Sequence, residues 1–135
     1  MSCVLRASGK QFDVDAFLKK SKLDPCAVFR RGEPKSKINP KSKKNTYSGI
    51  NVPVSNASFD NLRRQIKDAT TFLLNNKAEI RKLTKFKGVE GVGLDFGIRK
   101  RDTFTQSDEF PAELIAVAGS LGLSIMLSQY PISDE

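Results

Sequence analysis

The sequence contains no histidine, and this absence removes much of the acid–base chemistry that enzymes perform near neutral pH. Histidine is also a common metal ligand and an essential member of Ser-His-Asp and Cys-His arrangements. The acidic, lysine and cysteine residues that remain are not paired in the sequence in a way that would assemble a catalytic group. The sequence therefore predicts a noncatalytic protein with no catalytic residues, no metal site and no cofactor.

Cysteine is scarce as well. Two cysteines, Cys3 and Cys26, are too few for a disulfide framework or for a zinc site built from cysteine and histidine. We expect both to be small buried residues in two strands of one β-α-β unit. No apolar run is long enough to cross a membrane, and residues 1–6 lack the apolar stretch of a signal peptide. These observations predict a reduced, cytoplasmic protein without membrane insertion.

Basic residues, in contrast, are abundant and concentrated. The chain of 135 residues is 39% hydrophobic and 28% charged, which fits a single domain spanning residues 1–135. Its 23 basic and 15 acidic residues give a net charge of +8, and positions 30–44 alone carry +6. The basic residues of that segment are Arg30, Arg31, Lys35, Lys37, Lys41, Lys43 and Lys44. The rest of the domain is therefore nearly balanced in charge.

The same segment is poor in apolar residues. Residues 32–45 are rich in proline, serine, asparagine and lysine, and Ile38 is their one apolar side chain. A segment of this composition buries too little apolar surface to order itself. We therefore predict a mobile basic loop at about residues 32–45.

The residues before this loop predict a β-α-β unit. Residues 3–8 form the first strand, and Asp13 is placed to cap a short helix. Phe12 and Phe17 have the spacing of a hydrophobic staple across that helix start. A second strand is expected at residues 26–29.

A strand and two helices are expected after the loop. Residues 47–54 have strand character, and Pro53 indicates that this strand lies at a sheet edge or ends there. Ser58 is a candidate cap for a long amphipathic helix, which Asn75-Asn76 breaks or bends. A shorter helix then extends to about Lys85.

The clearest alternation of apolar and polar residues lies at residues 92–98 and predicts a central strand with one apolar face. Asp95 falls on the opposite face, where we expect an exposed carboxylate near Arg99.

A last helix and strand complete the chain. Pro111 suits the first helical position, Ile115 belongs to the apolar stripe of the helix, and Gly122 suits the residue after it. Residues 123–130 form the final strand.

The order of these elements predicts the fold class. It is β-α-β, then the basic loop, then β-α-(α), then β-α-β. We therefore expect an α+β sandwich of the ferredoxin-like kind, with one sheet and helices mainly on one face.

Two basic groups follow strands directly, Arg30-Arg31 and Arg99-Lys100-Arg101. If both lie at one sheet edge, they form a better anion site than either group alone. The predicted partner- or anion-binding residues are therefore Arg30, Arg31, Lys35, Lys37, Lys41, Lys43, Lys44, Arg99 and Arg101.

Short turn-like motifs at both ends of the chain resemble a family of small bacterial proteins known only as a domain of unknown function. The motifs are Ser8-Gly9, Phe12-Asp13, Leu23-Asp24-Pro25, Arg30-Arg31-Gly32-Glu33, Leu121-Gly122-Leu123 and Tyr130. The resemblance implies an α+β bacterial cytoplasmic protein without an assigned activity or catalytic residues to carry over. The long lysine-rich loop departs from the family.

Three functional hypotheses follow from these observations. The first is a noncatalytic, immunity-like binding protein that engages an acidic protein partner through the basic loop and a sheet edge. The second is nucleic-acid binding through the same lysines. The third is an enzyme or binder of an anionic small molecule held by Arg30, Arg31 and Arg99. The sequence does not indicate an oligomeric state.

Overall fold

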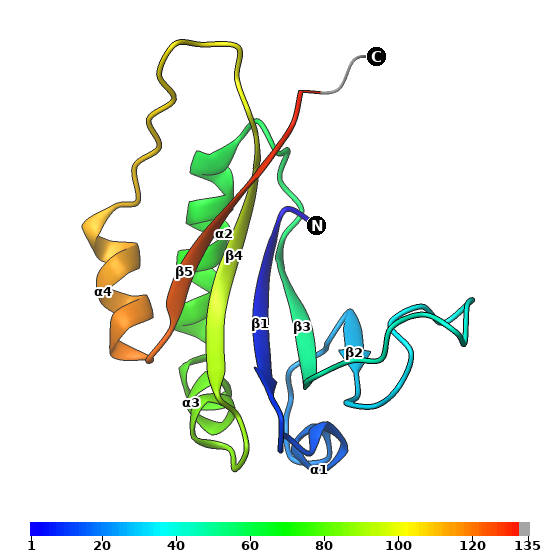
Figure 1. The fold of residues 1–135 in the computed structure, drawn as a ribbon. Coiled ribbons are helices and arrows are strands. Elements are labelled where there is room, and N and C mark those ends of the chain that lie inside the picture. The colour runs from blue at the N-terminus through cyan, green and yellow to red at the C-terminus, as the bar shows by residue number, and fades with distance from the viewer. Residues whose placement is uncertain (133–135) are drawn as a thin grey trace.

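The computed structural model describes residues 1–132, which form one five-stranded sheet and four helices (Figure 1). In chain order the elements are β1 (Cys3–Gly9), α1 (Val14–Leu18), β2 (Ala27–Phe29), β3 (Ser48–Ser55), α2 (Leu62–Asn75), α3 (Lys77–Lys85), β4 (Gly91–Arg99), α4 (Ala112–Ser120) and β5 (Ser124–Tyr130). The predicted α+β class and the predicted order of elements are confirmed.

The strands lie side by side in the order β2-β3-β1-β4-β5. β1 is antiparallel to both β3 and β4, and β2 is antiparallel to β3. β4 and β5 are parallel, and the connection between them passes through α4. Each end of the chain therefore forms a β-α-β unit, but β3 separates β1 from β2. This mixed sheet does not confirm the ferredoxin-like detail of the prediction.

One apolar core lies between the sheet and the helices. β1 directs Cys3, Leu5 and Ala7 into this core, and its alternate residues lie on the other face. Helices supply the rest, with Leu73 and Ile80 fully buried. The opposite face of the sheet is left without a covering helix (Figure 1). We call it the open face.

Local sequence signals account for the ends of α1 and α2. The Asp13 carboxylate accepts a hydrogen bond from the Ala16 N–H at 3.0 Å, so the predicted cap of α1 is confirmed. The predicted Ser58 cap of α2 is wrong. Asn61 caps this helix instead, because Ser58 begins a turn before it, in which the Asn61 N–H donates to Ser58 O at 2.9 Å.

The last helix and its neighbours differ from the prediction in two details. Pro111 precedes the first helical residue rather than occupying it. Ile115 is 53% exposed, because Val117 takes its place among the residues that face the core. Gly122 is confirmed as the residue after the helix: its φ is +75°, and the next N–H, that of Leu123, donates to Ala118 O at 2.9 Å.

Pro53 does not make β3 an edge strand. β2 pairs with β3 only along residues 49–51, so Pro53 lies beyond the short β2. A proline, which cannot donate a backbone hydrogen bond, is tolerated there because that side of β3 has no strand partner among the described residues.

The turn after β1 packs closely against the residues before β4. Gly88 has a φ of +90°, and a Cβ on it would overlap the carbonyl of Gln11. A Cβ on Gly9 would overlap the carbonyl of Gly88. Both positions therefore require glycine.

We predict that Gly88→Ala lowers the free energy of unfolding by about 1–3 kcal/mol, because alanine is strained at positive φ and its methyl group has no room. The control is Gly119→Ala in α4, where a methyl group meets no atom within 4 Å. Helix propensity should make this control neutral or up to about 1 kcal/mol more stable. Urea unfolding followed by circular dichroism distinguishes them, and equal stability of the Gly88 variant and the wild type would contradict the close packing.

Candidate functional site

The basic loop is an irregular hairpin between β2 and β3. The Gly32 N–H donates to Asn45 O at 2.9 Å, and the Lys35 N–H donates to Lys43 O at 2.8 Å. Pro34 and Lys44 form an isolated bridge between the two arms. The arms are therefore paired along most of their length. Mobility of the loop stays a prediction.

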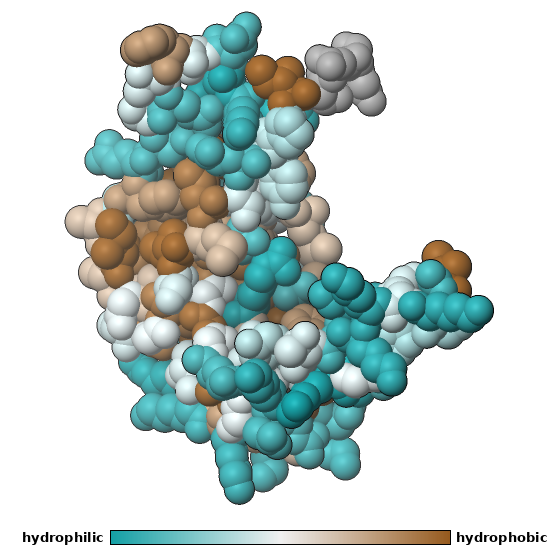
Figure 2. Space-filling view, in the orientation of Figure 1, coloured by the Kyte–Doolittle hydropathy of each residue, from teal (hydrophilic) through white to brown (hydrophobic). Residues whose placement is uncertain are grey.

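The lysines of this hairpin are exposed cations. Lys35, Lys37, Lys41, Lys43 and Lys44 are all exposed, and none has an ion-pair partner within residues 1–132. Ile38 at the tip is 95% exposed. The hairpin projects from the body of the molecule (Figure 2), so its charge is available to another molecule.

The arginines of the predicted site are largely occupied within the protein. Arg30 donates to both oxygens of Asp15, at 3.1 and 2.8 Å, and these hydrogen bonds raise the pKa of the guanidinium and lower that of the Asp15 carboxyl. Arg99 lies 3.5 Å from Asp60. These pairs neutralise charge that the sequence presents as free.

Arg101 is also paired, with Asp108 at 3.1 Å, whereas Arg31 is exposed and has no ion-pair partner in the described part of the chain. Of the four predicted arginines, Arg31 is therefore the one that adds to the charge of the lysines.

The two basic groups do not meet, and the idea of a shared anion site is wrong. β2 is parallel to β1, because both are antiparallel to β3, whereas β4 runs in the opposite direction to β1. Arg30 and Arg31 consequently follow the end of β2 beside the end of β1, and Arg99 lies beyond the start of β1. The strands β3 and β1 also separate β2 from β4.

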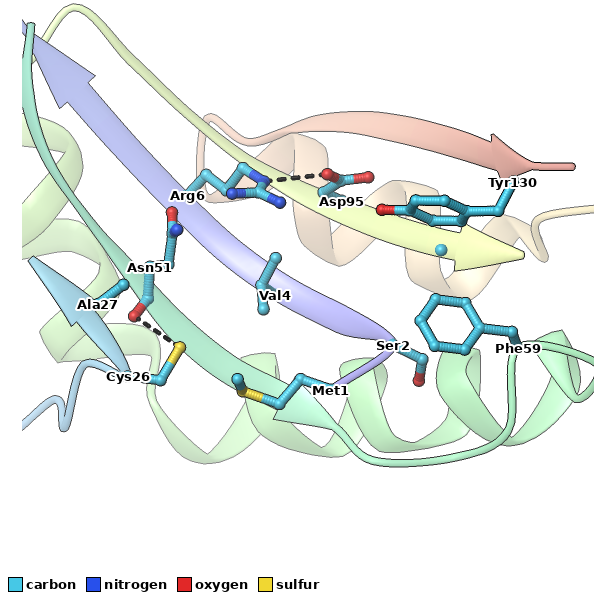
Figure 3. A pocket seen from close by; sticks show the side chains of 11 residues that line it. Met1, Ser2, Val4, Arg6, Cys26, Ala27, Asn51, Phe59, Asp95 and Tyr130 are labelled. Carbon is cyan, nitrogen blue, oxygen red and sulfur yellow. Dashed lines mark hydrogen bonds and ion pairs between the residues drawn. The ribbon is translucent and has the colours of Figure 1, made fainter. Parts of the chain in front are cut away.

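The open face has two shallow depressions, of about 250 and 300 Å³, that share Arg6 and Asp95. The first is also lined by Asn51, Phe59 and Tyr130, which approach from three different parts of the chain (Figure 3). The second lies over the glycines of β4. The two depressions lie on either side of the Arg6–Asp95 ion pair, and their shape can accept part of another molecule.

Asp95 is a buried carboxylate, 7% exposed, so the expected exposed side chain near Arg99 is wrong. The Arg6 Nε donates to one carboxylate oxygen at 2.9 Å, and the Ser128 hydroxyl donates to the other at 2.6 Å. These bonds join the central strand β1 to β4 and β5 across the open face. They provide the hydrogen-bond partners that a buried carboxylate needs.

Sequence reasoning missed this network because it depends on strand register. Arg6 lies opposite Gly93, two residues before Asp95, so its side chain reaches the carboxylate diagonally on the neighbouring strand. Gly93, Asp95 and Gly97 alternate along one face of the strand. A carboxylate between two glycines was the signal that could have indicated it.

The two cysteines have different environments. Cys3 is buried as expected, and its burial, with smaller contributions from the charges of Asp95 and Asp68, raises its pKa to about 12. Cys26 is exposed rather than buried, because it precedes the short β2 and lines a depression of the open face.

Asp95→Ala should lower the free energy of unfolding by about 1–3 kcal/mol, because it removes a buried hydrogen-bond acceptor from two donors. Asp60→Ala is the matched control, since its carboxylate is 60% exposed and pairs with Arg99 at 3.5 Å. The control should change stability by less than about 0.5 kcal/mol. Chemical unfolding of both variants is the measurement, and equal effects would contradict a structural role of the network.

Alkylation provides a separate check. Iodoacetamide at mildly alkaline pH should label Cys26 alone in the native protein, because Cys3 is inaccessible and its thiol stays protonated. A second label should appear only after unfolding. Mass spectrometry counts the labels, and rapid double labelling of the native protein would show that β1 is not packed as described.

No helix in residues 1–132 is both long and apolar enough to cross a bilayer. The same residues bring together no group of three acidic or cysteine side chains able to hold a metal ion.

Comparison with known proteins identifies a family and nothing more specific. No curated protein and no solved structure matches the chain. The family model described as a domain of unknown function, DUF4279, matches residues 1–131, which is nearly the whole chain and the whole of the fold described above. The chain belongs to the DUF4279 family.

Proposed function

We propose that this protein is a noncatalytic binding protein that engages an acidic protein through its basic hairpin and the neighbouring β2 edge. The observation that carries the proposal is the set of five exposed lysines on one projecting hairpin, none with an ion-pair partner within residues 1–132. Their concentration on one hairpin distinguishes them from the lysines scattered over the helices, and the nearby Arg30 has an acidic partner. Lysines without such partners attract an oppositely charged surface and accelerate its association.

A protein partner is favoured by the apolar tip of the hairpin. Ile38 is 95% exposed in the middle of the lysines. An aliphatic side chain surrounded by charge matches the usual arrangement of a protein interface, in which an apolar contact is enclosed by a polar rim. The expected partner therefore has an acidic surface with a small apolar depression.

The form of this function that we propose is immunity-like: the protein neutralises a toxin by covering an acidic surface on it, in a bacterial cytoplasm. Two free cysteines support a reduced compartment. The adjoining open face, with its depressions around Arg6 and Asp95, supplies additional contact area beside the hairpin.

Charge reversal of the loop tests the proposal. Glutamate in place of Lys35, Lys37, Lys41, Lys43 and Lys44 should leave the melting temperature nearly unchanged, because these side chains make no internal ion pair in the described structure. Capture of an acidic protein from a lysate of the source organism should fall at least about tenfold, as measured by quantitative mass spectrometry.

The matched control reverses five exposed lysines on the helices and the turns beside them, with the same change in net charge. These are Lys19, Lys20, Lys67, Lys77 and Lys85. The control should retain capture. Capture that is unaffected by the loop substitutions, or reduced equally by the control, would rule out a specific role for the hairpin.

The same lysines could instead bind nucleic acid, and a separate titration distinguishes this alternative from a protein partner. If the five lysines contacted phosphates of a DNA duplex, the logarithm of the affinity would fall with log salt at a slope of about −4 to −5. A fluorescence titration with duplex DNA measures the slope. A slope of this size, lost in the loop variant, would replace the protein partner by nucleic acid.

A further inference from the structure

The edge strand β5 has an unprotected edge. It is seven residues long, pairs with β4 alone among the described strands, and keeps an unbroken register. Its residues, Ser124 to Tyr130, include no charge and no proline. Soluble proteins usually protect such edges with charges, prolines, bulges or short strands. The opposite edge follows that rule, since β2 has three residues and adjoins the basic hairpin.

Helix α4 lies beside this edge and is apolar on two sides. Leu114, Val117 and Ala118 face the core. Glu113, the one charged residue of the helix, lines a groove against α2. The remaining face presents Ile115, which is 53% exposed, together with three small exposed residues, Ala112, Ala116 and Gly119. A helix that is apolar nearly all round is usually covered on both sides.

These two features border the β5 edge on the two faces of the sheet. Met126 is in register with Asp95 and lines the open-face depression, whereas α4 lies on the helix-covered face. Met126 on β5 is 58% exposed, and Ile115 on α4 is exposed to a similar degree. In the space-filling view, hydrophobic residues gather over α4 and β5, on the side opposite the basic hairpin (Figure 2). Exposed apolar side chains therefore flank the β5 edge on both faces, and exposed apolar surface of this kind marks interaction sites in soluble proteins.

We propose that a second copy of this chain occupies this surface, through antiparallel pairing of β5 with β5 about a two-fold axis near Leu127. The pairing places Ser124 opposite Tyr130 and Met126 opposite Ser128, so no like charges face each other. This matters because each chain carries a net charge of +8, and its charged hairpin lies at the far edge of the sheet. An acidic partner gains nothing from this surface, whereas an identical copy meets a complementary edge.

The symmetry has a structural consequence. Two antiparallel edge strands related by a two-fold axis perpendicular to the sheet join the sheets into one, with order β2-β3-β1-β4-β5-β5-β4-β1-β3-β2. Both copies of α4 then lie on the same face near the axis, where their exposed apolar sides approach each other. The interface combines backbone hydrogen bonds along β5 with burial of Ile115 on the helix-covered face and of Met126 on the open face.

Analytical ultracentrifugation of the full chain across the micromolar range tests this dimer. The wild type should show a reversible monomer–dimer equilibrium. Met126→Lys and Ile115→Lys should each raise the dissociation constant about tenfold or more, since each places like charges on both copies close to the two-fold axis. Ile38→Lys is the matched control: it adds the same charge at an exposed aliphatic residue on the opposite edge and should leave the constant unchanged.

Hydrogen exchange adds a readout that does not depend on the variants. Backbone amides of β5 should become more protected as the concentration of wild-type protein rises, and those of β2 should not. A wild type that stays monomeric over the whole range would overturn the proposal. A dimer that persists unchanged in both β5 and α4 variants, or that Ile38→Lys weakens equally, would also overturn it. Circular dichroism confirms that each variant is folded.

Discussion

Helices cover only one face of the sheet, so polar groups on the other face must find their hydrogen-bond partners within the sheet itself. Apolar residues of β1, β3 and β4 are committed to the core, so alternate positions on the same strands form a face without a covering layer. A carboxylate on that face is buried by its neighbours and needs donors from the sheet itself. The network of Arg6, Asp95 and Ser128 supplies them and thereby links three strands.

The sequence was sufficient for the features that depend on local chemistry. The Asp13 cap, the helix end at Gly122 and the apolar face of β4 each follow from residues a few positions apart, and each is confirmed. Features that depend on register or on distant packing were not accessible. Asp95 looked exposed because its donors come from strands 33 and 89 residues away.

The same limit applies to the predicted functional residues. The charge of the hairpin is evident in the sequence, but which cations are free depends on acidic residues elsewhere in the chain. Three arginines form ion pairs with acidic residues: Arg30 with Asp15, Arg99 with Asp60, and Arg101 with Asp108. The directions of the strands also place the two arginine groups at opposite ends of the sheet. The lysines keep their charge available because no acidic side chain of the described residues reaches them.

The two sides of the sheet have opposite characters, and this division makes the two proposals compatible. Cationic residues gather beyond β2, whereas the β5 side is uncharged and apolar. Pairing through β5 would place the two hairpins at the far ends of one continuous sheet, with both open faces on the same side. Each hairpin then stays accessible, and a partner with two acidic surfaces at the matching separation would be held by both. Binding through two linked sites strengthens attachment without any new contact, because the second contact forms at a high effective concentration.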